Sequence, residues 1–359
     1  LTLFVRNTTV YPLNFRKTLK IYVSATIEER NGFDAWSAKQ SVQPLNGTAG
    51  QDSTGESVDP NHFVVIQAEY GELTAQITSH QAASVELRLE GVNPGSELID
   101  QTHGVMLKHE HDFNSDMSSI LSVSTAYKKQ NRTASEIAWL FLSQYDWNAE
   151  MGLKYTGIQS HLIQAGVQFV YEDNLHSFFH DVGENKQLLY DEDTHGLGFY
   201  IDDHYSYNEK LTLIGGVRVD HNTLVDKDKL YGGRIAGVLQ ATDIWTSKLL
   251  YNRTNRLPSP MSSLNQLWGF NKPNAPVWAT GSPNAKKAEQ LATIKWGNSL
   301  SLEKVHLFLN LYHQELKDFI TWGSPHSNVG DFEGNGLEFS LIYQLSDEVS
   351  LWGNAAYNN

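Results

Sequence analysis

The sequence predicts an all-β protein, an antiparallel β-barrel formed as one unit by all 359 residues. About sixteen short segments alternate polar and apolar residues, the pattern of strands that have one wet and one apolar face. The connections between these segments are short and long in turn, as in a barrel with one tight rim and one elaborated rim. No break in composition marks a linker between domains.

The clearest pair of strands runs from Gly196 to Asp220. Successive side chains on a strand point to opposite faces, so each of these strands has one apolar and one polar face. The first strand alternates Leu197, Phe199 and Ile201 with Gly198, Tyr200 and Asp202, and the second alternates Leu211, Leu213, Val217 and Val219 with Thr212, Gly216, Arg218 and Asp220. Residues 207–210 between them predict a compact reversal.

A soluble β-sandwich, barrel or propeller shares this alternation, so the alternation alone does not decide between soluble and membrane folds. Polar residues recur on one face of many segments, for example Gln164 and Gln168 in one and Glu338, Ser340 and Gln344 in another. In a membrane barrel these residues line the lumen, while every second residue meets lipid.

Composition excludes several classes of protein. Hydrophobic residues make up 40% of the chain and the mean hydropathy is −0.40. The longest apolar run, residues 137–142, is far shorter than the roughly 20 residues of a membrane helix. With 27 basic and 41 acidic residues the formal charge is −14, which does not favour nucleic acid as a partner. The absence of cysteine rules out disulfides and thiolate metal sites within the chain.

The order of the connections favours the membrane barrel. Short reversals are expected near residues 11–17, 112–116, 156–160, 207–210, 241–244, 297–302 and 345–348. Long segments are expected at 29–61, 91–102, 172–195, 220–231, 252–287 and 313–332. Large outer-membrane barrels place nearly all their long loops at one rim, whereas a compact soluble domain seldom contains so many.

Four stretches resemble one known family, the TonB-dependent outer-membrane receptors. The paired segments GFYIDDHY at 198–205 and KLTLIGGVRVDH at 210–221 look like mid-barrel strands of that family. The segment NRLPSP at 255–260 resembles the family's F-R-x-P element, and GSPNAKKAE at 281–289 resembles its G-N-P-x-L-K-P-E element. NGLEFS at 335–340 resembles the G-x-E strand that follows a loop.

The resemblance implies a location in the bacterial outer membrane and a barrel of about 22 strands, plugged by an N-terminal domain. It also implies import of a scarce ligand, driven by the TonB-ExbB-ExbD complex through the plug. The chain opens in strand-like sequence and ends without a terminal aromatic residue. Residues 1–359 are therefore expected to be part of the barrel, with the plug domain and the terminal strands absent.

The longest predicted loop, 252–287, is the best candidate for ligand binding because it combines cations with large aromatic surfaces. Its candidate residues are Arg253, Arg256, Trp268, Phe270 and Trp278, and Trp322 lies in the loop that follows His313. This combination suits an anionic or aromatic ligand such as a ferric siderophore. Stacking against a sugar would use the same aromatic side chains, and so would simple packing of the loop.

No catalytic residue, cofactor or metal site is predicted. The sequence has neither a Gly-x-Ser-x-Gly elbow nor a phosphate-binding loop. His109 and His111 share a strand face but have no evident third ligand, so they are expected to be polar residues of the lumen. The alternatives left open are a passive porin or adhesin barrel and a soluble β-rich carbohydrate-active enzyme.

Overall fold

A computed structural model describes residues 2–12, 18–28, 61–85, 97–134, 138–181, 187–188, 192–226, 229–259, 286–321 and 327–359. Within these ranges the chain forms one antiparallel sheet of seventeen strands, which confirms the predicted all-β class. The strands are β1 (Thr2–Pro12), β2 (Thr18–Glu28), β3 (Asn61–Tyr70), β4 (Leu73–Val85), β5 (Glu97–Asp112), β6 (Met117–Ala134), β7 (Ala138–Tyr155), β8 (His161–Asp181), β9 (Gln187–Leu188), β10 (Thr194–Ser206), β11 (Leu211–Asn222), β12 (Leu230–Thr242), β13 (Trp245–Arg256), β14 (Glu289–Ser301), β15 (Val305–Lys317), β16 (Phe332–Gln344) and β17 (Ser350–Asn358).

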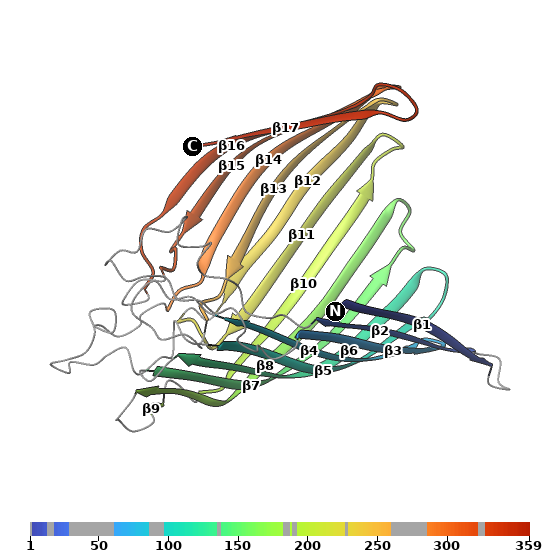
Figure 1. Cartoon of the computed structure of the whole chain (residues 1–359). Helices are drawn as coiled ribbons and strands as arrows, with labels where there is room; N and C mark the ends of the chain where they lie inside the picture. Colours follow the sequence, from blue (N-terminus) through green and yellow to red (C-terminus); the bar gives the residue numbers. More distant parts are fainter. Residues whose placement is uncertain are drawn as a thin grey trace.

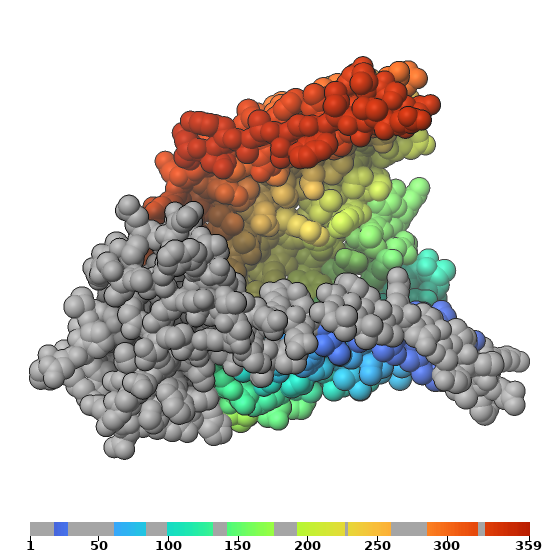
Figure 2. All heavy atoms as spheres, viewed as in Figure 1, coloured from blue at the N-terminus to red at the C-terminus, as the bar shows by residue number. Residues whose placement is uncertain are grey.

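The strands follow one another as a meander. Each strand pairs with the next one in sequence, with one exception. The two-residue β9 pairs only with residues near the end of β8, and β8 itself pairs with β10. The sheet curves into an open trough (Figure 1), and within the described ranges no register joins β17 to β1. The hollow of the trough lies between the strands at the C-terminal side and those at the N-terminal side (Figure 2).

Short turns gather at one end of the sheet, on the right in Figure 1, which is called the turn end below. The turns at 113–116, 156–160, 207–210, 243–244 and 345–349 lie where the sequence predicts them. The turn at Gly71–Glu72 was missed, although its glycine has the positive φ of 62° that such turns favour. The reversal predicted at 297–302 is displaced to 302–304, because Gly297 lies within β14 opposite Asn310.

The opposite end carries the longer connections and is called the loop end. The prediction of a loop over 172–195 is wrong in part, because β8 continues to Asp181. This extension pairs with the start of β7, from Ala138 to Ser143, so its backbone groups have partners. Its sequence does not alternate polar and apolar residues, which is why it was not predicted as a strand. The connection from β6 to β7 spans only residues 135–137, although a long connection is expected at this end of the sheet.

The two faces of the sheet differ as the sequence predicts. Apolar side chains on the convex face are largely exposed, for example Phe199 at 55%, Val217 at 60% and Ile235 at 69%. The residues between them in sequence, such as Tyr200 and Arg218, lie on the concave face and contact polar partners there. An outward apolar face and an inward polar face are what a barrel wall in lipid requires.

Burial is concentrated at the loop end. Val225, Leu230 and Ala288 form a buried apolar cluster where β12 and β14 begin. Among the described residues, no helix is long and apolar enough to cross a membrane.

Candidate functional site

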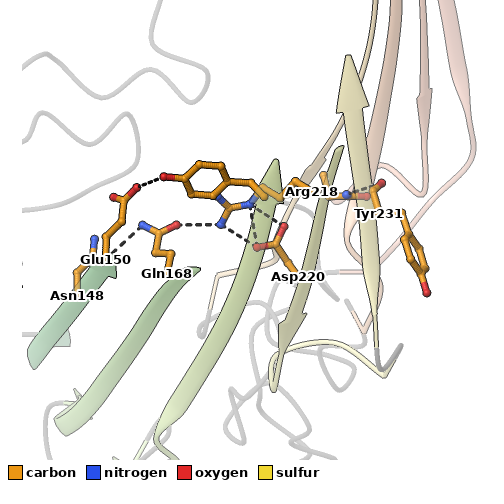
Figure 3. Close-up of polar contacts among 8 residues, drawn as sticks. Asn148, Glu150, Gln168, Arg218, Asp220 and Tyr231 are labelled. Carbon is orange, nitrogen blue, oxygen red and sulfur yellow. Dashed lines mark hydrogen bonds and ion pairs between the residues drawn. The ribbon is translucent and has the colours of Figure 1, made fainter. Parts of the chain in front are cut away.

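A chain of polar side chains crosses the concave face from β7 to β11 (Figure 3). The Tyr200 hydroxyl on β10 donates to Glu150 Oε1 on β7 at 2.9 Å and so passes over β8. Arg218 Nη2 on β11 donates to Gln168 Oε1 on β8 at 2.8 Å and so passes over β10. Arg218 Nε also lies 2.9 Å from each carboxylate oxygen of Asp220. The two sets of contacts together link four strands and give each charged group a polar partner.

Glycines make these crossings possible. A methyl group on Gly166 would lie 2.5 Å from Tyr200 Oη, and one on Gly198 would lie 2.6 Å from Arg218 Nη2. Each glycine sits on the strand that the long side chain passes over. Because these positions carry no Cβ, the tyrosine and the arginine lie flat along the wall instead of projecting into the lumen.

The same arrangement recurs one step further along the sheet. Arg234 on β12 reaches across β11 and forms two parallel hydrogen bonds with Asp202 on β10, Nε to Oδ2 and Nη2 to Oδ1, each 2.8 Å long. Here the Asp202 carboxylate lies over Gly216 of β11, where a methyl group would clash with it. His204 Nε2 lies 2.8 Å from Asp202 Oδ1. Paired donors facing paired acceptors form one of the stronger kinds of side-chain contact, and here they link β12 to β10 across β11.

A groove of about 570 Å³ lies among these side chains, within the size range of about 300–1,000 Å³ that small-molecule sites occupy. It reaches the loop end, since Asn222, Leu230 and Leu257 are among the residues that line it. Its polar lining includes Gln164, Gln168, Tyr200, Asp202, Arg218, Asp220, Arg234, Asn252 and Thr254. Such a surface can offer hydrogen-bond donors and acceptors to a polar solute, while Arg218 and Arg234 are already paired with Asp220 and Asp202.

The structure describes two of the six residues predicted to bind ligand. Arg253 Nη2 donates to Gln290 Oε1 at 2.7 Å, and its place in the alternation of β13 puts it on the same face as the exposed Leu249 and Tyr251. Arg256 lies at the loop end of β13 and binds Glu289. The other four, Trp268, Phe270, Trp278 and Trp322, lie outside the described residues. The ligand-binding role of all six stays a prediction.

The contact between Arg256 and Glu289 joins two of the motif-like segments found in the sequence. Arg256 Nε lies 2.5 Å from Glu289 Oε2, and Nη2 donates to Glu289 Oε1 at 2.6 Å. The side chain of Glu289 is only 4% exposed, whereas that of Arg256 is 64% exposed. The Ile320 backbone N–H also donates to Glu289 Oε1, at 2.7 Å. This buried carboxylate is therefore satisfied by one guanidinium and one backbone group.

The groove and the Glu289 contact were not identified from the sequence. The polar faces of β10 and β11 were predicted, but the partners on other strands were not, because the contacts join residues 32 to 50 positions apart. One signal was present in the sequence. Gly198 and Gly216 occupy polar-face positions of strands that otherwise carry long side chains, which indicates that something lies across them.

His109 and His111 do not face the lumen, so that expectation is wrong. They share a strand face with the exposed Val105 and Leu107, and both approach Glu72 in the turn between β3 and β4. His111 Nδ1 lies 2.9 Å and His109 Nε2 lies 3.5 Å from Glu72 Oε2. Among the residues that the structure describes, no group of three or more His, Cys, Asp or Glu side chains is arranged to hold a metal ion.

A family model for the TonB-dependent receptor-like β-barrel matches residues 21–359, and the chain belongs to this family. Barrels of this family are outer-membrane proteins of Gram-negative bacteria, and the family comprises transport receptors rather than enzymes. The comparison with curated proteins gives no match.

Solved structures share the fold at low sequence identity. A ferric enterobactin receptor from Pseudomonas aeruginosa is 13% identical, with a TM-score of 0.68 over 98% of this chain and 58% of its own. The ferric yersiniabactin uptake receptor from Yersinia pestis is 14% identical, with a TM-score of 0.67 over 100% of this chain and 59% of its own. The copper transporter OprC is 12% identical, with a TM-score of 0.68 over 100% and 60%. The chain thus spans less than two thirds of the length of these structures.

Proposed function

We propose that the protein is an energy-coupled importer that captures a scarce ligand at its loop end and passes it along the polar lumen. The observation that carries this proposal is the pairing of an exposed apolar convex face with a grooved polar concave face that reaches the loop end. A wall of this kind separates lipid from an aqueous path. The proposed import involves no covalent reaction of the ligand.

The proposed ligand is a ferric siderophore or a similar chelate. Two of the structural neighbours are named for ferric chelates and a third for copper. The loop 257–288 carries Trp268 and Trp278 together with Lys272, a combination that suits an anionic ligand with aromatic groups. Trp268, Phe270, Trp278 and Trp322 are proposed as contacts, and the groove between β8 and β13 would receive the ligand next. Arg253 lies on the outward face of β13 and Arg256 is bound to Glu289, so neither is proposed as a contact.

The described sheet is proposed to be part of a larger barrel with a plug domain in its lumen. The sheet is open, and the chain spans about three fifths of the matched structures. Coupling to the TonB-ExbB-ExbD complex would act through the plug. Outer-membrane lipid would cover the convex face, where the large apolar side chains are exposed.

A passive porin is the alternative that shares the wall. It differs in its energy requirement, because diffusion through an open pore does not depend on the proton-motive force. An adhesin barrel would differ in carrying no solute across the membrane at all.

The test measures binding and uptake of radiolabelled iron chelates in a strain that lacks the gene and in the complemented strain. We expect the complemented strain to bind one class of ferric chelate with or without an uncoupler, and to take it up only when energised. Chelates with catecholate, hydroxamate and carboxylate ligands identify the class. Uptake that persists in the presence of the uncoupler would establish the passive porin instead.

A further inference from the structure

Residues 286–289, which precede and begin β14, contact the bases of three different loops at the loop end. The loop 257–288 is closed at its base by the ion pair between Arg256 and Glu289. The Ile320 N–H bond to the same carboxylate brings in the start of the next loop, 318–331. Glu289 therefore contacts two loops through one buried group.

Asn328 makes the second attachment of loop 318–331. Its Nδ2 donates to the carbonyl oxygens of Lys287, at 3.0 Å, and of Asp318, at 2.7 Å, and its Oδ1 accepts from Lys287 N–H at 3.1 Å. Lys287 Nζ also donates to Asp318 Oδ1 at 3.0 Å. An amide that pairs with both backbone groups of one residue acts like a strand neighbour and fixes the separation of the two segments.

Loop 223–229 is attached from the other side. The Asp226 N–H donates to the Lys286 carbonyl oxygen at 2.9 Å. Val225 and Leu230, one within this loop and one directly after it, pack against Ala288 in the buried cluster. Three loops that are distant in sequence thus meet at four consecutive residues.

We propose that residues 286–289 are a common base for the three loops and that Glu289 and Arg256 are positioning residues of the ligand vestibule. They set the spacing of the loops, while other residues contact the ligand. The burial of Glu289 supports this assignment, because a carboxylate that is only 4% exposed is stable where its donors are held in place. The part of this inference that concerns ligand affinity rests on the proposed function.

The spacing itself is tested without a ligand. Residues 1–359 contain no cysteine, so within this part of the protein spin labels introduced through Asp226→Cys and Val329→Cys attach only to loops 223–229 and 318–331. We expect a narrow distribution of distances between the labels in isolated outer membranes and a clearly broader one when Glu289→Ala is added. Glu289→Gln should give an intermediate width, since its amide oxygen still accepts from Ile320 N–H but no longer carries a charge.

Asp202→Ala is the matched control because it removes an arginine–aspartate fork of similar geometry from the wall, away from the loop bases. It should leave the distance distribution unchanged. Heat-dependent gel mobility shows that each variant has assembled as a barrel. Equal widths in the Glu289→Ala and Asp202→Ala proteins would overturn the inference.

The second measurement is the affinity of the same membranes for a ferric tris-catecholate. In the wild type the loops are held in place before the ligand binds, whereas in the Glu289→Ala protein the ligand must order them itself. The variant should therefore bind about three- to tenfold more weakly. The maximal uptake rate should be retained, and Lys108→Ala, which removes an ion pair near the turn end, should not alter affinity. Broadened distances with unchanged affinity would refute the positioning role. If Glu289→Ala broadens the distances but the wild-type protein binds no ferric chelate, the common base is supported and the proposed ligand is refuted.

Discussion

Val217 on the convex face gives the sharpest test of how the wall meets lipid. Strand β11 starts at the turn end with Leu211, and Val217 lies six residues further along it. At about 3.4 Å per residue and a tilt of about 40°, this places Val217 about 16 Å above the turn end, close to the middle of an apolar band about 25 Å tall. Leu213, two residues from the same start, is only about 5 Å above it by the same reasoning. Val217→Arg should therefore cost about 2 to 4 kcal/mol of stability, and Leu213→Arg about 0 to 1 kcal/mol.

The assay is a urea titration of the complete protein folded into phospholipid vesicles, followed by tryptophan fluorescence. Thr212→Arg is the control for the added charge, because Thr212 lies on the concave face next to Leu213 in sequence. It should cost less than Val217→Arg, since its side chain meets water instead of lipid. Equal costs at the three positions would refute the assigned facing and depth.

Three further predictions concern the wall and the loop end. Gly166→Val should displace the tyrosine that lies across it and destabilise the barrel by about 1 to 3 kcal/mol in the same titration, whereas Gly215→Val, which meets open space, should be nearly neutral. Arg256→Met should lower the stability of the barrel more than Arg234→Met does. It leaves the Glu289 carboxylate, which is only 4% exposed, without its cation, whereas the Asp202 partner of Arg234 is 13% exposed. A reversed order of the two variants in the urea titration would contradict this reasoning. Trp268→Ala should weaken binding of a ferric chelate about two- to thirtyfold at both low and high salt, and a loss that disappears at high salt would argue against stacking.

The sequence predicted the parts of the fold that depend on contact with lipid. Phe199 and Val217 must be apolar because they face the bilayer, so the alternation in β10 and β11 could be recognised without a structure. Beyond the bilayer this constraint ends, and the extension of β8 to Asp181 has no such pattern. Gly297 looked like a turn residue because glycine favours turns, although here it leaves room beside Asn310 on a strand.

The candidate site was less predictable because its contacts are made between strands that are distant in sequence. Glu289 and Arg256 are 33 residues apart, and nothing in either segment alone indicates that a buried carboxylate meets a guanidinium there. Their segments were noticed only as motif-like stretches. The pairing depends on the register between β13 and β14, which places these two residues opposite each other.

The glycines beneath Tyr200, Arg218 and Asp202 have a consequence for how this wall can evolve. Each contact joins two strands that are separated by one other strand, and each depends on a glycine in that intervening strand. Replacing one of these glycines would displace the side chain that lies across it. Such a replacement would favour compensating changes in the two strands on either side, which are not themselves neighbours. Correlated substitutions among related sequences should therefore link β7 with β10, β8 with β11, and β10 with β12, in addition to the adjacent strand pairs of an ordinary antiparallel sheet.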